Sequence, residues 1–314
     1  MQSKKSLEKF WLFTICLLFL MPLFLGCTRQ DKNNHKYKIL VTTTPVGDLV
    51  KNLVDSSIEV DILMGPGVDP HSYTPSAGDV NRILESDMII SSGLHLEGKM
   101  GEIFQGLEDK KIAVFSLGDT LDKNSLILEE EGIYDPHIWW DVGLWSETID
   151  PLADFLSQNL PIEKSQIANK AKAYKEKLLI LDKETEERIS SIPKEKRTLV
   201  TGHDAFSYFA RAYNMEVLSI QGLNTNDEAG AGKMDTLAKY LAEHKIKAIF
   251  AETGTSGKNI QVLLEATQGY GFETEIGGHL YSDSLGKEGT NEGTYLGAVE
   301  ANVDKIVNGL KEGK

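Results

Sequence analysis

The stretch Ile162–Ile192, IEKSQIANKAKAYKEKLLILDKETEERISSI, decides how this 314-residue chain is organised. Apolar or small residues recur along it at intervals of three and four, the spacing of one face of an α-helix. Lysine and glutamate fill many of the other positions, and Pro193 ends the pattern because proline cannot continue a helix. About thirty residues at about 1.5 Å each give about 45 Å, the length of a whole domain. The expected buried face consists of Ile167, Ala171, Tyr174, Leu178, Leu181, Thr185, Ile189 and Ile192.

On both sides of this segment, short β-rich runs alternate with helical patterns, which predicts parallel sheets covered by helices. We therefore predict an α/β protein of two lobes, each a mainly parallel sheet with flanking helices, joined by one long backbone helix. A coiled-coil arm is the alternative, but the single apolar stripe and the α/β flanks favour a rigid connection between lobes. Strands are expected at 38–43, 59–64, 88–92, 111–116, 198–201, 216–220, 248–251 and 273–276. The predicted segments are a lipoprotein signal peptide at 1–26, a tether at 27–36, an N-terminal lobe at 37–160, the linking helix at 161–193 and a C-terminal lobe at 194–314.

The first residues of the chain predict export. Three lysines precede an apolar run at 10–26, the pattern of a secretory signal. A retained membrane anchor is the alternative, because the run nearly reaches spanning length, but Pro22 interrupts its end. Leu23–Cys27, LFLGC, is similar to a bacterial lipobox, with Phe24 where leucine is usual. Cys27 is therefore the expected lipidation site. The other cysteine lies within the segment to be removed, so no internal disulfide is expected.

The composition limits the class of protein. The chain is 41% hydrophobic and 25% charged, with a net charge of −14. These values are typical of a globular protein and exclude a disordered chain, a disulfide scaffold and a multi-span membrane protein. An acidic chain is not expected to bind nucleic acid. Anionic lipid would also repel it, so a lipid on the protein would have to hold it at a membrane.

Several histidines lie where a metal ligand would be useful. The tripeptide Asp-Pro-His occurs at 69–71 and again at 135–137. Proline fixes the backbone before each histidine and so lowers the entropy cost of holding its ring. His203 follows a predicted strand, at the sheet edge where ligands gather; the neighbouring Asp204 is a helix-cap candidate. Asp283 also follows a strand, and its local sequence fits either a hard oxygen ligand or a turn carboxylate.

Further motifs accompany these histidines along nearly the whole mature chain. They are GPGVDPH at 65–71, DPHxWxD at 135–141, GHDAFxYF at 202–209, QG at 221–222, EAG at 228–230, AE at 251–252 and Asp283. Together they resemble the metal-binding lipoproteins of bacterial ABC importers, the cluster A-I or TroA-like/ZnuA-like superfamily. The resemblance implies two α/β lobes bridged by one long helix, with a metal site between the lobes. It implies His71, His137, His203 and Asp283 as metal ligands, with Glu252 and Arg211 as candidates for groups that support the ligands.

This ligand set suits a divalent transition metal. Imidazole and carboxylate are accepted together by zinc and similar cations, and four protein ligands would fill a tetrahedral zinc site. Relatives specialised for zinc often carry a histidine-rich acidic loop between the first two ligands and a disulfide. This chain has no histidine between 119 and 135, and therefore resembles the manganese/zinc/iron branch. The expected cargo is zinc or manganese, with iron as a further option.

The resemblance implies an extracytoplasmic solute-binding lipoprotein that delivers its metal to an ABC permease and its ATPase for import. It implies a monomer that is not an enzyme, held by the lipid on Cys27 at the outer face of the cytoplasmic membrane, on the periplasmic or cell-envelope side. A surface adhesin is one alternative. A metallohydrolase with Glu252 as base is another, but catalytic zinc normally keeps an open coordination position. Since ligand histidines must be neutral, metal affinity is expected to weaken below about pH 6.

Overall fold

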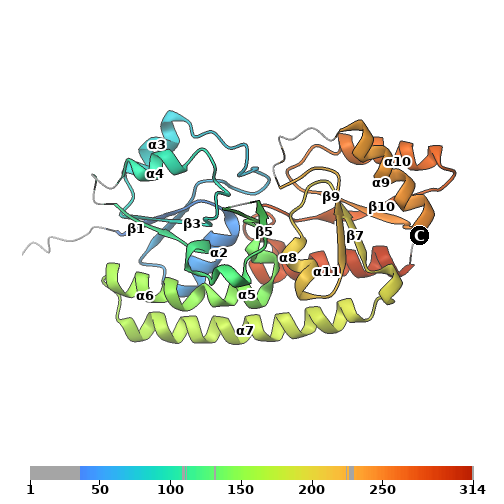
Figure 1. Ribbon diagram of the computed structural model, residues 1–314. Coiled ribbons are helices and arrows are strands. Elements are labelled where there is room, and N and C mark those ends of the chain that lie inside the picture. The colour runs from blue at the N-terminus through green and yellow to red at the C-terminus, as the bar shows by residue number, and fades with distance from the viewer. Residues whose placement is uncertain are drawn as a thin grey trace, which may run out of the picture. The chain divides into compact units, whose positions relative to one another are not determined.

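Two lobes lie side by side above one long helix (Figure 1). This computed structural model describes residues 36–107, 110, 112–130, 132–223, 225 and 230–312. The predicted signal peptide, Cys27 and all of the predicted tether except Lys36 lie outside the described residues, and their boundaries stay predictions. Residues 37–314 form one structural unit. Among the described residues, no helix has both the length and the apolarity needed to cross a membrane.

The N-terminal lobe contains a four-stranded parallel sheet in the order β2-β1-β3-β4. Its central strands β1 and β3 are almost entirely buried, as expected for apolar runs covered on both faces. Strand β1 ends earlier than predicted, because the chain turns after Val41 into a helix that starts at Thr44. The elements are β1 (Lys38–Val41), α2 (Thr44–Leu53), β2 (Glu59–Ile62), α3 (Ala77–Leu84), β3 (Met88–Ser91), α4 (Gly101–Gln105) and β4 (Ala113–Ser116).

The C-terminal lobe repeats this style with two parallel strand pairs, β7-β8 and β9-β10, and β7 lies beside β9. Helices α9 and α10 lie on one side of these strands and α11 on the other (Figure 1). Strand β10 continues past its predicted end at 276 because Gly277 and Gly278 allow Phe250 and Lys305 to approach its backbone. The elements are β7 (Thr198–Thr201), α8 (Ser207–Ala212), β8 (Glu216–Ser219), α9 (Ala231–His244), β9 (Ala248–Glu252), α10 (Lys258–Gly269), β10 (Glu275–Leu280) and α11 (Tyr295–Glu312).

The segment between β4 and the long helix holds elements that the sequence did not predict. They are the antiparallel pair β5 (Leu128–Glu130) and β6 (Ile133–Tyr134), and the helices α5 (Val142–Glu147) and α6 (Ile149–Asn159). Short 3₁₀ turns also occur in this segment, at η3 (Gly118–Thr120), η4 (Lys123–Ser125) and η5 (Ile138–Trp140). Two more lie in the C-terminal part of the chain, at η6 (Lys194–Lys196) and η7 (Asn291–Gly293).

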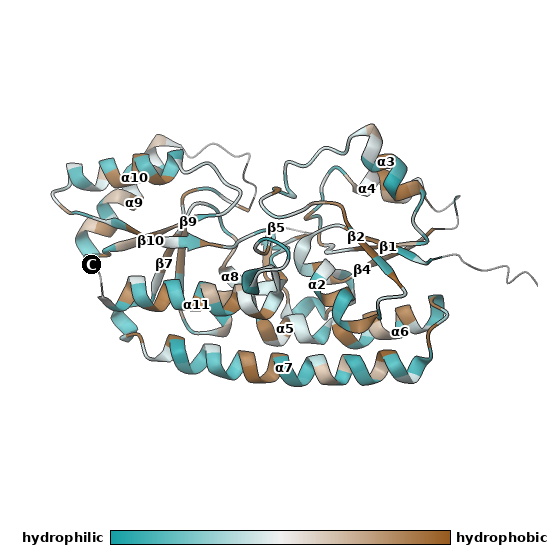
Figure 2. Ribbon diagram, turned by 180° about the vertical axis from the view of Figure 1, so that it is seen from behind, coloured by the Kyte–Doolittle hydropathy of each residue, from teal (hydrophilic) through white to brown (hydrophobic). Residues whose placement is uncertain are grey.

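The predicted long helix is present as α7 (Lys164–Ser190), and its 27 residues span about 40 Å. All eight residues of the predicted stripe are buried, which confirms the helical periodicity. The helix packs on α2, α5 and α6 of the N-terminal lobe and on α11 of the C-terminal lobe. Hydrogen bonds reinforce both halves: Tyr174 donates to Asp48 at 2.9 Å, and Tyr213 donates to Asp182 at 2.8 Å. Figure 2 shows mostly hydrophilic residues along this helix and hydrophobic strands inside the lobes.

One apolar cluster continues from the N-terminal lobe through α7 into the C-terminal lobe. Trp140 stacks on Phe206 with ring centroids 5.4 Å apart, and Trp145 stacks on Tyr295 at 5.9 Å. The hydroxyl of Tyr295 also donates to the carbonyl of Trp139 at 2.6 Å. The two lobes therefore share a core, and moving them apart would expose large aromatic surfaces to water.

Candidate metal centre

The structure brings together the four residues that the resemblance implied as ligands. His71 lies in the loop after β2, His137 immediately before η5, His203 after β7 and Asp283 after β10. One ligand atom from each lies within 4.8 Å of all the others, and no second such group of His, Cys, Asp and Glu occurs among the described residues. The side chains are at most 5% exposed. Two residues come from each lobe, so the group bridges the two lobes.

The three imidazoles present the same ring nitrogen to one point. The Nε2 atoms of His71 and His137 are 3.2 Å apart, and they lie 3.6 and 3.3 Å from Asp283 Oδ1. The Nε2 atom of His203 lies 3.4 Å from Asp283 Oδ2, so both carboxylate oxygens face imidazoles. A tetrahedron with metal–nitrogen bonds of about 2.0–2.1 Å has edges of about 3.3 Å. The spacing of these atoms therefore fits the first coordination shell of one cation.

An aspartate two residues before each histidine of the Asp-Pro-His motifs fixes its loop. Asp69 Oδ1 accepts a hydrogen bond from the backbone N–H of His71, and Asp135 Oδ1 accepts one from that of His137, both at 2.9 Å. Asp135 Oδ1 also lies 2.7 Å from His137 Nδ1. With Nδ1–H donating to this carboxylate, Nε2 keeps its lone pair for a metal. We did not predict Asp135 as a supporting residue, although the Asp-x-His spacing was the signal for it.

Glu252 supports the third imidazole in the same way. Its Oε2 contacts His203 Nδ1, and its Oε1 accepts hydrogen bonds from the backbone N–H groups of Gly202 at 2.7 Å and His203 at 3.0 Å. Glu252 is buried at the end of β9, so one side chain positions both the ring and the turn that carries it. The structure thus places Glu252 where a supporting group is needed.

Arg211, the other candidate for such a group, is placed differently. Its guanidinium donates to the carbonyl of Ser125 at 2.8 Å, pairs with Asp141 at 3.4 Å and lies over the ring of Tyr208. It makes no hydrogen bond to any of the four residues. Its nearest connection is through Tyr208, which donates to the carbonyl of Asp135 at 2.9 Å.

Asp283 is held by its neighbours while its carboxylate remains available. The indole N–H groups of Trp139 and Trp140 donate to the carbonyl of Ser282, at 3.0 and 2.9 Å. Asp283 Oδ1 and His203 Nε2 are buried and have no hydrogen-bond partner among the described residues. Unpartnered buried polar atoms are rare. Their convergence on one point indicates that a cation belongs between them.

The charges around the centre explain its ionisation in the metal-free protein. Burial lowers the pKa of His137, but the charge and hydrogen bond of Asp135 and the nearby Asp283 outweigh this and raise it to about 9. Burial likewise opposes protonation of His203, whose pKa is nevertheless raised well above its usual value by Asp283 and Glu252. Burial raises the pKa of Asp283, but the imidazoles, His203 foremost, hold it well below its usual range. The centre is therefore built to hold positive charge, which a proton or a metal ion can supply.

One of the motifs that carried the resemblance, EAG at 228–230, is only partly described, whereas QG at 221–222 is fully described. Gln221 and Gly222 follow β8, and the Gly222 carbonyl accepts a hydrogen bond from the backbone N–H of Asp204 at 3.1 Å. Glu228 and Ala229 of the EAG motif lie outside the described residues.

Comparison with known proteins also identifies metal-binding relatives. The family profile described as zinc-uptake complex component A, periplasmic (ZnuA) matches residues 39–309. The zinc-binding protein TroA of Treponema pallidum is 42% identical over 275 residues, covering 87% of this chain and 89% of that protein. The manganese-binding lipoprotein MntA of Bacillus subtilis is 38% identical and covers 94% of this chain and 97% of its own. The solved structure of the periplasmic zinc-binding protein TroA superposes with a TM-score of 0.86 at 41% identity, covering 88% of this chain and all of that one. The chain belongs to the ZnuA family of metal-binding proteins.

Proposed function

We propose that this protein captures one divalent transition metal ion between its lobes and delivers it to an ABC permease, with its ATPase, for import. The observation that carries the proposal is the convergence of three Nε2 atoms and the Asp283 carboxylate on one buried point. Similar proteins named for zinc, for manganese and as ABC transporter substrate-binding lipoproteins support the same function. A deletion strain is expected to lose high-affinity uptake of zinc or manganese and to regain it with the wild-type gene. Unchanged uptake of both would contradict the proposal.

The arrangement of the centre suits the capture of a metal ion better than the catalysis of a hydrolytic reaction. Four protein ligands leave no open position on a tetrahedral zinc ion, and catalytic zinc normally keeps one for water. The carboxylate that would have to act as a base, Glu252, is engaged with His203 and two backbone N–H groups. A hydrolytic rate that is lost on mutation of Glu252 would instead favour an enzyme. Binding to host matrix that survives loss of all four ligands would favour an adhesin.

The ligand set keeps zinc and manganese as the leading cargo candidates, with iron as a further option. Three imidazoles suit zinc, and manganese is at the weak end of the divalent stability series. Because both oxygens of Asp283 face the imidazoles, a bidentate carboxylate and a five-coordinate manganese ion are also compatible with the distances. Competition between zinc and manganese for the purified protein would measure which metal binds more tightly. Uptake at matched metal supply would measure which metal the cell imports.

We also propose that the protein is anchored outside the cytoplasmic membrane through a lipid on Cys27 and acts as a monomer. The lipobox-like sequence before Cys27 and relatives named as lipoproteins support the anchor. A Cys27→Ala variant is expected to leave the membrane fraction after the envelope is broken. A variant that remains fully membrane-bound would contradict lipid attachment at this residue.

The Glu252→Gln substitution is expected to weaken metal binding by about 10- to 100-fold, the usual cost of losing a group that supports a ligand histidine. Glutamine keeps the shape of the side chain but removes the charge that favours an Nδ1–H on His203. Isothermal titration with zinc measures the effect. Glu265→Gln, on the exposed side of α10, is the matched control and should bind as the wild type does. Equal affinities of both variants would contradict the role of Glu252.

Metal affinity is expected to fall already between pH 9 and pH 6. The pKa of His137 is raised to about 9, so this ring carries a proton in the metal-free protein at neutral pH, and the raised pKa of His203 favours a proton on that ring too. Metal binding must displace these protons, and affinity then drops about tenfold per pH unit for each one displaced. The decline thus begins above the value of about pH 6 expected for an unperturbed imidazole. Competition titrations across this range, together with proton release measured in two buffers, test the expectation; a flat affinity from pH 9 to 7 would contradict it.

A further inference from the structure

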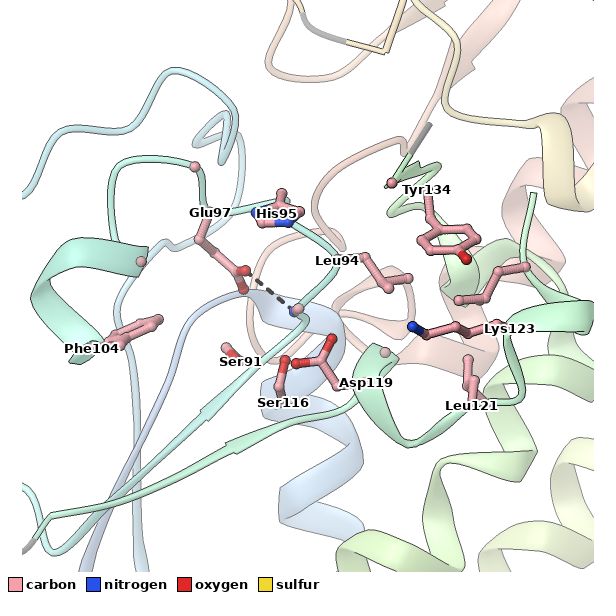
Figure 3. Close-up of a pocket in the computed structure, with 16 residues that line it drawn as sticks. Ser91, Leu94, His95, Glu97, Phe104, Ser116, Asp119, Leu121, Lys123 and Tyr134 are labelled. Carbon is pink, nitrogen blue, oxygen red and sulfur yellow. Dashed lines mark hydrogen bonds between the residues drawn. The ribbon is translucent and has the colours of Figure 1, made fainter. Parts of the chain in front are cut away.

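A cavity lies in the N-terminal lobe. It has a volume of about 470 Å³ and includes none of the four metal-binding residues in its wall. Ser91 at the end of β3 and Ser116 at the end of β4 form its floor (Figure 3). The carboxyl ends of parallel strands are where α/β proteins usually bind ligands, and the volume is within the range of small-molecule sites.

Two opposite charges face this cavity without being paired. Figure 3 shows the ammonium of Lys123 and the carboxylate of Asp119 directed into the same space. Among the described residues, neither side chain makes an ion pair or a hydrogen bond, and they do not pair with each other. The remaining wall includes the apolar side chains of Leu94, Phe104 and Leu121.

One wall of the cavity is held in an unusual backbone conformation. Gly93, Leu94 and His95 have φ values of 85°, 53° and 64°, and a left-handed conformation is costly for the two residues that are not glycine. The buried carboxylate of Glu97 fixes this segment by accepting hydrogen bonds from the backbone N–H groups of Ser92 at 2.8 Å and Gly93 at 3.3 Å. A side chain at position 93 would collide with the Ser116 hydroxyl. Glu97 therefore holds this wall of the cavity in place.

From this arrangement we propose that the cavity binds a free α-amino acid with an apolar side chain. The carboxylate of Asp119 would receive its ammonium group and Lys123 its carboxylate, while the apolar wall would receive its side chain. A simple anion would be repelled by Asp119 and a simple cation by Lys123. A metal ion is not expected there, because the one potential metal-binding group among the described residues is the centre between the lobes.

Equilibrium dialysis of the full mature protein against each standard L-amino acid tests the proposal. We expect saturable binding of one apolar amino acid per chain, in both the metal-loaded and the metal-free protein. For phenylalanine as probe, phenylalaninamide and 3-phenylpropionate, which each lack one charge, should bind at least about tenfold more weakly. Absence of binding by every amino acid at millimolar concentration would overturn the proposal.

Charge-removing variants locate the site. Lys123→Met and Asp119→Asn should each weaken amino acid binding at least about tenfold while leaving metal content unchanged, because both residues are exposed and lie outside the metal centre. Lys258→Met and Asp154→Asn, exposed residues elsewhere, are the matched controls and should bind as the wild type does. Binding that both cavity variants retain would overturn the proposal without touching the proposed metal transport.

Discussion

Replacement of both His71 and His137 by alanine is expected to leave the protein without bound metal, where the wild type carries one ion per chain. The two rings supply two of the three Nε2 atoms that meet Asp283. Binding free energies of four-ligand zinc sites are about 10–16 kcal/mol, or roughly 3 kcal/mol per ligand when shared equally. The loss of two ligands then weakens binding by about 10⁴-fold. Native mass spectrometry after dialysis against a weak chelator measures the bound ion.

The control for this experiment is a second double histidine variant. His244 and His279 are exposed, and neither belongs to the ligand group, although His279 is close to Asp283 in sequence. Their joint replacement by alanine should leave the bound ion in place. Circular dichroism of both variants establishes that they are folded. Metal retained at full occupancy in the His71/His137 variant would contradict the proposed centre.

The long helix and the strands of the two lobes could be predicted because their signals are local. The spacing from Ile167 to Ile189 repeats along a single helix, and each turn buries the same face against whichever lobe it meets. Helix α5 gave no such signal, whereas α6 buries Ile149, Leu152, Ala153 and Leu156 at helical spacing and was missed although its signal is local. The buried residues of α5 are nearly consecutive and therefore do not form one helical stripe; they are Val142, Leu144 and Trp145. The position of α5 depends on its packing against α6 and α7, which is a tertiary effect.

The candidate centre was predictable for a different reason. Its four residues lie in separate loops, and spacing alone gave no information on whether they meet; the family resemblance supplied that. The sequence also offered Glu252 as a supporting group, but Asp135 was not predicted as one. The pairing of His137 with Asp135 is local in sequence, whereas that of His203 with Glu252 joins the ends of β7 and β9, which lie side by side only in the folded C-terminal lobe. The support of Asp283 by Trp139 and Trp140 crosses from one lobe to the other.

Because Trp140 packs and hydrogen-bonds across the two lobes, its replacement should lower stability strongly. The Trp140→Ala variant is expected to lose about 3–5 kcal/mol of unfolding free energy, the usual cost of deleting a buried tryptophan side chain. Trp140 is 1% exposed, stacks on Phe206 and donates to the Ser282 carbonyl. For a protein of this size the melting temperature should fall by roughly 10 °C. Differential scanning calorimetry in the presence of a chelator measures the metal-free protein, so stabilisation by bound metal does not enter.

A graded pair of variants separates packing from hydrogen bonding. Trp140→Phe keeps an aromatic ring against Phe206 and loses chiefly the bond to Ser282, so its cost should be nearer about 1–2 kcal/mol. Tyr270→Ala, at a residue 44% exposed on the C-terminal lobe, should change stability by less than about 0.5 kcal/mol. If Trp140→Ala melted like the wild type, the shared aromatic core would not stabilise the contact between the lobes. That contact would then depend on the metal and α7 alone. A large loss with a single cooperative transition would instead mean that the lobes unfold together, because the cluster beneath the metal centre belongs to both.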